Sequence, residues 1–148
     1  MRSEFWFFHP FRVRYSEIDA QAVVFNAHYL TYFDTAITEY LRAVGYDQYE
    51  DAKATGNDFH TVRCLVEYKI PLRFDQEFDV GVRVAKIGNS SVTFELAVFP
   101  KGGEALHARG EVVWVNANQE THAPVRVSDT VRRRLTSNPH PSSAALNS

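Results

Sequence analysis

The alternation of hydrophobic and polar residues divides the chain into one long helical segment and five strand-like segments. From residue 27 to residue 44, apolar side chains recur at spacings of three and four without an intervening Gly or Pro, which is the period of an amphipathic helix. Asn26 stands at the expected N-cap position, and Gly45 follows the last apolar residue. The pattern therefore predicts one helix of about five turns, which is long for a domain of this size.

The strand-like segments show an apolar–polar period of two. Residues 11–15 alternate before the helix, and residues 59–72, 77–87, 91–99 and 105–116 alternate after it. Turns that contain Gly, Pro or Asn separate the later segments, as in antiparallel hairpins. Residues 47–55 predict a short second helix, and Ser128 predicts the cap of another that runs to Leu135. We expect residues 136–148, rich in Ser, Asn, Pro and Ala, to form a disordered tail.

The order of the segments, one strand, one long helix and then four strands, predicts an α+β fold. A five-stranded antiparallel sheet that curls around the helix would form a single domain from residues 1–135. One helix covers only part of such a sheet, so we expect sheet edges or helix ends to be buried by a second copy of the chain. The 148 residues include 11 Phe, 7 Tyr and 2 Trp, and a core plus such an interface would bury this aromatic surplus.

Composition and charge exclude several other classes of protein. The net charge of −2 gives no broad basic face for nucleic acid or for an anionic membrane. A single cysteine, Cys64, excludes an intrachain disulfide and a multi-Cys metal site, and the 6 His show no metal-ligand spacing. No apolar run approaches the roughly 20 residues of a membrane span, and the first residues lack the apolar core of a signal peptide. We therefore expect a cytoplasmic protein without a bound metal.

The segment between the first strand and the helix carries the candidate chemistry. Asp19 precedes Asn26, at the expected helix start, by seven residues. The N–H groups at a helix N-terminus are unpaired and partly positive, so they can stabilise an oxyanion. An aspartate beside them can attack a carbonyl carbon or take a proton from water. From residue type alone, Asp19 is better explained as a turn or capping carboxylate, and a plain N-cap explains Asn26 and is compatible with a role in the site.

Residues 13–30, which read VRYSEIDAQAVVFNAHYL, resemble the acyl-CoA thioesterases of the hot-dog fold, in the branch of 4-hydroxybenzoyl-CoA thioesterase and the YbgC-type enzymes. The similarity continues through the helix and a Gly-x-Ser-Ser-x-x-Phe hairpin at residues 88–94, and covers about residues 11–127. The resemblance implies that Asp19 is the nucleophile or general base and that a backbone N–H near Asn26 is the oxyanion donor. It also implies no metal or redox cofactor beyond the coenzyme A of the substrate, and a homodimer or dimer-based homotetramer with the site at the subunit interface.

The resemblance and the side-chain chemistry together give the candidates for contact with the substrate. These candidates are His28, His60, Thr61, Lys86, Asn89, Ser90 and Ser91. The two in the expected second strand stand near where family members line the acyl pocket from the neighbouring subunit. The hairpin residues would bind the pantetheine or phosphates of coenzyme A, with Lys86 or Arg109 supplying charge. An edge strand and a plain hairpin turn explain the same residues without a ligand.

The chain departs from the family at three positions. Ala22 stands where Gly is usual, Asn26 where the YbgC branch usually has His, and Ile37 where many members have Arg. An L side chain at residue 22 restricts positive φ and so bears on the shape of the loop.

The resemblance predicts hydrolysis of a small or medium acyl thioester, aromatic acyl groups included, with acyl-carrier protein open as the carrier. A hot-dog enoyl-CoA hydratase would need His where Val24 stands, and a non-catalytic, dimeric acyl-CoA-binding protein is the main alternative.

Overall fold

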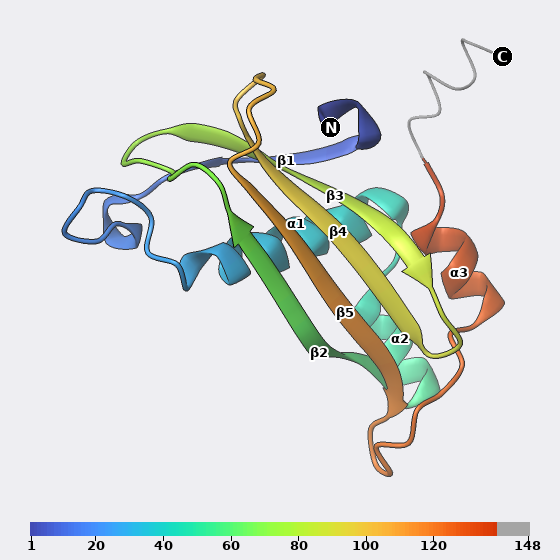
Figure 1. Cartoon of the computed structure of the whole chain (residues 1–148). Coiled ribbons are helices and arrows are strands. Elements are labelled where there is room, and N and C mark those ends of the chain that lie inside the picture. Colours follow the sequence, from blue (N-terminus) through green and yellow to red (C-terminus); the bar gives the residue numbers. More distant parts are fainter. Residues whose placement is uncertain (139–148) are drawn as a thin grey trace, which may run out of the picture.

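The computed structural model describes residues 1–138, which form one five-stranded antiparallel sheet with helix α1 (His28–Val44) across one face (Figure 1). The strands are β1 (Phe7–Arg12), β2 (Asn57–Tyr68), β3 (Glu77–Ile87), β4 (Ser91–Pro100) and β5 (Ala108–Asn118). Their order across the sheet is β1-β3-β4-β5-β2, so β1 and β2 are its edges. The predicted architecture is confirmed. Residues 139–148, most of the predicted tail, lie outside the described residues.

Most predicted bounds are confirmed within a few residues, and two differ for physical reasons. β1 occupies Phe7–Arg12 instead of residues 11–15, because this run pairs with β3 whereas Tyr15–Glu17 coil into a short 3-10 helix, η2. Pro10 is tolerated within β1 because an edge strand has one unpaired side. β2 ends at Tyr68, before the predicted residue 72, because the next two amides, of Lys69 and Ile70, both donate to the His107 carbonyl and Pro71 then has no N–H to donate.

The shorter helices stand where the sequence predicts them. Helix α2 (Gln48–Thr55) follows α1, and helix α3 (Asp129–Leu135) follows the sheet. The Val131 N–H donates to the Ser128 hydroxyl at the start of α3, so the predicted cap is confirmed. Gly45 ends α1 in the left-handed conformation, at φ 74°.

The core lies between α1 and the inner face of the sheet. The apolar stripe of α1 is buried there: Tyr29, Tyr32, Phe33, Ala36, Ile37, Tyr40, Leu41 and Val44. The Phe33 ring lies directly against Gly110 of β5, where an added Cβ would overlap Cε2 of that ring. α1 packs mainly on β1 and β3, so the inner face of β2 keeps exposed side chains at Thr61, Cys64 and Tyr68.

The outer face of the sheet is partly covered by the first residues of the chain. Phe5 packs with Ala97 and Phe99 in a small second hydrophobic cluster. Arg2 fixes this segment, because its Nη2 lies 2.7 Å from Oδ2 of the buried Asp79. Both faces of the sheet therefore carry hydrophobic clusters, the larger of them under α1. Within residues 1–138, no helix is long and apolar enough to cross a membrane.

A tight loop connects η2 to α1 and holds one strained residue. Ile18 and Val24 form an antiparallel bridge across the base of the loop. Ala22 stands at the tip with φ 61°, in the left-handed region that usually requires Gly. Ala22 therefore occupies the conformation of the family's usual Gly, and the loop carries backbone strain.

Replacing Ala22 with Gly should stabilise the protein. Removing the Cβ relieves the left-handed strain and outweighs the extra entropy of Gly in the unfolded chain, so we expect Ala22→Gly to raise the free energy of unfolding by about 1 kcal/mol. Urea denaturation would measure this change. Ala20, in the same turn, has no positive φ, so Ala20→Gly should destabilise slightly. Equal effects of the two substitutions would contradict the assignment of strain to Ala22.

Adding a single methyl group at Gly110 should disrupt the contact between α1 and the sheet. Its Cβ would overlap the Phe33 ring, so we expect Gly110→Ala to lower the free energy of unfolding by about 2 kcal/mol. The double variant with Phe33→Leu should lose less stability than the sum of the two single variants, because the smaller side chain makes room. Strict additivity in the denaturation curves would contradict this packing.

Candidate active site

Asp19 lies near the tip of the tight loop, with its carboxylate exposed and its backbone fixed. Its N–H donates to the Val23 carbonyl (2.9 Å), and the Ala22 N–H donates to the Asp19 carbonyl (3.0 Å). One carboxylate oxygen accepts the Gln21 N–H at 2.8 Å. The loop's own backbone therefore sets the direction of the carboxylate, as a rigid general base or nucleophile requires.

The connection between β2 and β3 holds this loop in place from outside. The Val24 N–H donates to the Leu72 carbonyl (2.9 Å), and the Phe74 N–H donates to the Ala22 carbonyl (3.2 Å). Val23 and Arg73 form an isolated antiparallel bridge between these two bonds. The loop thus runs beside residues 72–74 like a short extra strand, which explains how an exposed segment keeps one conformation.

The start of α1 differs from the sequence prediction. Asn26 is not the N-cap: the helix begins at His28, the cap position is Ala27, and no side chain caps it. The turn before the helix satisfies the first amides instead, because the Tyr29 N–H donates to the Asn26 carbonyl (3.2 Å). That carbonyl also accepts from the Tyr68 hydroxyl at 3.4 Å.

Two backbone amides at this helix start have no acceptor among residues 1–138. They are the N–H groups of Asn26 and Ala27, both on exposed residues. Amides at a helix N-terminus carry partial positive charge, so this pair can stabilise a negative oxygen. The Asn26 side chain is therefore not a helix cap, but the Asn26 backbone N–H stays a candidate oxyanion donor.

Glu17 is a buried carboxylate that the sequence analysis did not single out. Its side chain accepts hydrogen bonds from the Tyr32 hydroxyl (2.8 Å) and the Arg14 backbone N–H (2.8 Å), and pairs with the Arg14 guanidinium. Burial alone would raise the pKa of Glu17, but these donors together hold it below its usual range. Burial, with the neighbouring Glu17 charge, raises the pKa of Tyr32. An acid two residues before Asp19 was the only sequence signal.

The predicted substrate-binding residues do not gather at one place in the chain. His28 begins α1, immediately after the turn that follows the Asp19 loop. His60 and Thr61 lie near the other end of β2. Seven residues separate Thr61 from Tyr68, which contacts the helix start, and in a strand this distance is about 23 Å. One chain alone therefore does not bring His60 and Thr61 to the Asp19 carboxylate.

The β3–β4 hairpin lies at the same end as His60. Ser91 pairs with Val115 of β5, and Val115 pairs with His60, so two strand spacings, about 10 Å, separate Ser91 from His60. The Asn116 N–H donates to the Ser90 carbonyl (2.7 Å), which fixes the turn. The structure thus brings the predicted hairpin residues together with the β2 candidates, and apart from Asp19.

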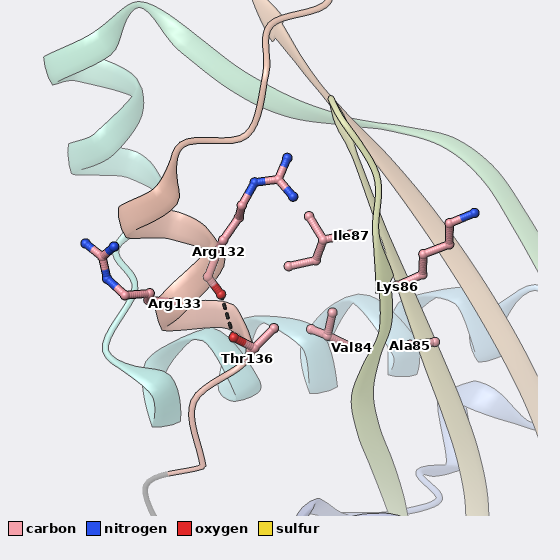
Figure 2. Close-up of a pocket in the computed structure, with 7 residues that line it drawn as sticks. All are labelled: Val84, Ala85, Lys86, Ile87, Arg132, Arg133 and Thr136. Carbon is pink, nitrogen blue, oxygen red and sulfur yellow. Dashed lines mark hydrogen bonds between the residues drawn. The ribbon is translucent and has the colours of Figure 1, made fainter.

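A cleft of about 380 Å³ lies beside this hairpin, between β3 and α3 (Figure 2). Lys86, Arg132 and Arg133 contribute to its lining. Arg132 is structural, because its Nη2 donates to the carbonyls of Gly88 (2.8 Å) and Asn89 (3.0 Å). In Figure 2, Lys86 points away from α3, and Arg133 points away from β3. The cations therefore do not converge on one anion position.

A larger groove, of about 750 Å³, runs along the end of α1 that is far from Asp19. Thr38, Leu41, Arg42 and Tyr46 line it together with Asp58 at the start of β2. The Tyr46 hydroxyl donates to Asp51 at 2.8 Å, so this tyrosine is fixed. The groove has no signature in the sequence, because its residues come from α1, α2 and β2 without a shared pattern.

Cys64 lies on β2 between the two groups of candidates. Partial burial, together with the charge of Asp34 on α1, raises the pKa of its thiol. A thiol with a raised pKa is a weak nucleophile at neutral pH. Burial also raises the pKa of Asp34. Among residues 1–138, no group of three His, Cys, Asp or Glu side chains is placed to hold a metal ion.

A family model and the sequence relatives of this chain agree on one family of proteins. The model of the thioesterase-like superfamily matches residues 13–135. A putative esterase of Aquifex aeolicus is 32% identical over 121 residues, which cover 82% of this chain and 94% of that protein. The acyl-CoA thioesterase YbgC of Haemophilus influenzae is 30% identical over 86 residues, which cover 58% of this chain and 63% of that protein.

A solved structure agrees with these sequence relatives. The crystal structure of the PA5185 protein from Pseudomonas aeruginosa has a TM-score of 0.79 and 32% sequence identity, and the match covers 90% of this chain and 92% of that one. The resemblance noted from residues 13–30 is thereby confirmed across the fold. The chain belongs to the thioesterase-like superfamily and is a thioester hydrolase with the hot-dog fold.

Proposed function

We propose that this protein hydrolyses the thioester of a small or medium acyl-CoA, aromatic acyl groups included, with Asp19 as the catalytic carboxylate. One observation carries the proposal: a rigid, exposed aspartate precedes a helix start at which two backbone amides, those of Asn26 and Ala27, have no acceptor. In this reading the thioester carbonyl oxygen accepts from those amides, and the carbonyl carbon faces Asp19. Coenzyme A enters only as part of the substrate.

Hydrolysis of a thioester can proceed with only one carboxylate and two backbone amides. As general base, Asp19 takes a proton from water while the water oxygen bonds to the carbonyl carbon, and the helix-start amides stabilise the oxyanion. The C–S bond then breaks, the thiolate of coenzyme A leaves and takes up a proton, and the free acid remains. As nucleophile, Asp19 would first form a mixed anhydride with release of the thiolate, and water would then hydrolyse it. Both routes use the same residues.

We also propose that the working site is built from two copies of the chain. The inner face of edge strand β2 is left open by α1, and exposed apolar side chains follow the strand at Val62, Leu65 and Tyr68. Long exposed edge strands tend to pair with another chain. If two β2 edges pair about a two-fold axis, the strands run antiparallel, and the Tyr68 end of one copy meets the Asn57 end of the other.

This arrangement gives roles to the candidates that a single chain keeps apart. The His60 and Thr61 end of one copy, with the groove beside Arg42, would complete the acyl pocket next to Asp19 of the other copy. The hairpin, with Asn89 to Ser91 and nearby Lys86, would then lie where the pantetheine and phosphates leave the pocket, and His28 would stand at its mouth. A dimer and a dimer-based tetramer both provide this contact. The expected cytoplasmic location rests on the single cysteine and stays a prediction.

Removing the charge of Asp19 should abolish turnover. We expect Asp19→Asn to lower kcat at least about a hundredfold, because the amide is neither a base nor a nucleophile. Thiol release over a panel of acyl-CoA and acyl-carrier-protein substrates measures the rate. The control is Asp129→Asn, which removes an exposed carboxylate from an ion pair of little energetic weight. Full activity of Asp19→Asn would overturn the mechanism, and tight acyl-CoA binding without turnover by the unaltered protein would instead indicate a binding protein.

Blocking the β2 edge should separate the copies and remove activity together. A Lys on an edge strand opposes pairing, so we expect Val62→Lys to raise the dimer dissociation constant at least about tenfold and to lower activity in proportion to the monomer fraction. Sedimentation velocity against the chain mass of 16.9 kDa gives the oligomeric state. Thr130→Lys, on the exposed side of α3, is the matched control. A fully active monomer would overturn the two-copy site.

A further inference from the structure

The contacts of Glu17 connect the loop that carries Asp19 to helix α1. The residue is 6% exposed, and its carboxylate is held by the Tyr32 hydroxyl and by Arg14. Its backbone carbonyl accepts the Phe25 N–H at 2.9 Å. Because Glu17 precedes the Asp19 loop and Phe25 follows it, this one residue closes the base of the loop and ties it to α1.

The Tyr32 side chain, which donates the hydrogen bond to Glu17, is held firmly in the core. Its ring is 3% exposed and packs beside those of Phe11, 5.2 Å away, and Phe78, 5.0 Å away, which belong to two different strands and stack on each other. The ring of Tyr29, one turn earlier, is 6.0 Å away. A buried side chain packed against three neighbouring rings cannot change rotamer without disturbing the core. The hydroxyl therefore has a fixed position relative to both α1 and the sheet.

The hydrogen bond between Glu17 and Tyr32 connects the two parts of the site whose relative position matters for catalysis. The Asn26 and Ala27 amides belong to the start of α1, whereas Asp19 belongs to the loop. Loss of the bond between Glu17 and Tyr32 would leave the loop attached to residues 72–74 and, through the Phe25 N–H, to the turn before α1, but no longer to the body of the helix, so the loop could shift against it. A displacement of about 1 Å between reacting groups is enough to slow an enzymatic step strongly.

We propose that Glu17 and Tyr32 form a positioning pair, which holds the Asp19 carboxylate at the right distance from the helix-start amides. The inference rests on the proposed thioester hydrolysis by Asp19. Neither side chain touches the substrate, so the pair acts on the rate of the chemical step and leaves binding of the acyl carrier unchanged.

A matched pair of Tyr→Phe variants on α1 tests the proposal. Tyr32→Phe removes the hydroxyl that binds Glu17. Tyr40→Phe removes a buried hydroxyl that donates to the Leu135 carbonyl at 2.7 Å, on the far half of the same helix. Well below both melting temperatures, we expect Tyr32→Phe to lower kcat about tenfold with KM within twofold of the original. Tyr40→Phe should lower the melting temperature by a similar amount and leave kcat unchanged.

Substitutions at Glu17 give an independent readout. Glu17→Gln keeps an acceptor for the Tyr32 hydroxyl and should retain most of kcat, whereas Glu17→Leu keeps none and should lose as much as Tyr32→Phe. The pair is overturned if Tyr32→Phe and Tyr40→Phe have equal kcat values, or if Glu17→Gln and Glu17→Leu do. When the original protein is active and Asp19→Asn is not, such equality overturns only the positioning role. Absence of thiol release from every substrate by the original protein overturns the proposed function and the positioning role together.

Discussion

Burial of the apolar stripe of α1 against the inner face of the sheet is the interaction on which the rest of the structure depends. The Phe33 ring packs directly on Gly110, where any side chain would push it away. Because the helix is fixed along its length, its first turn is fixed as well, and so are the amides that precede it. The chemistry proposed for Asp19 is possible only because the helix start is as rigid as the core.

The second constraint on the structure is that a single long helix covers only part of the inner face of the sheet. One helix leaves much of the inner face of β2 uncovered, and Thr61, Cys64 and Tyr68 stay exposed there within residues 1–138. The same geometry places Asp19 and His60 at opposite ends of that strand. The second copy proposed beside β2 would meet a hydrophobic requirement and a chemical requirement together.

Apolar periodicity predicted the elements whose burial repeats regularly. α1 and β3 have nearly the predicted bounds because apolar residues recur at spacings of three and four along α1 and at every second position from Phe78 to Val84 in β3. The start of α1 was misassigned at Asn26, since a preceding turn can satisfy the first amides as well as a side chain does. Glu17 was missed because burial of an acid depends on Tyr32, a partner fifteen residues away in sequence, and no local pattern records such a pairing.

The position of the first residues has a practical consequence. Arg2 and Phe5 are packed on the outer face of the sheet, through Asp79 and Phe99. Any peptide attached ahead of them therefore emerges on the side opposite α1. A sensor surface or fluorescent label joined there would leave the helix start and the open side of β2 accessible to solution, which suits direct measurements of ligand binding and of association between copies.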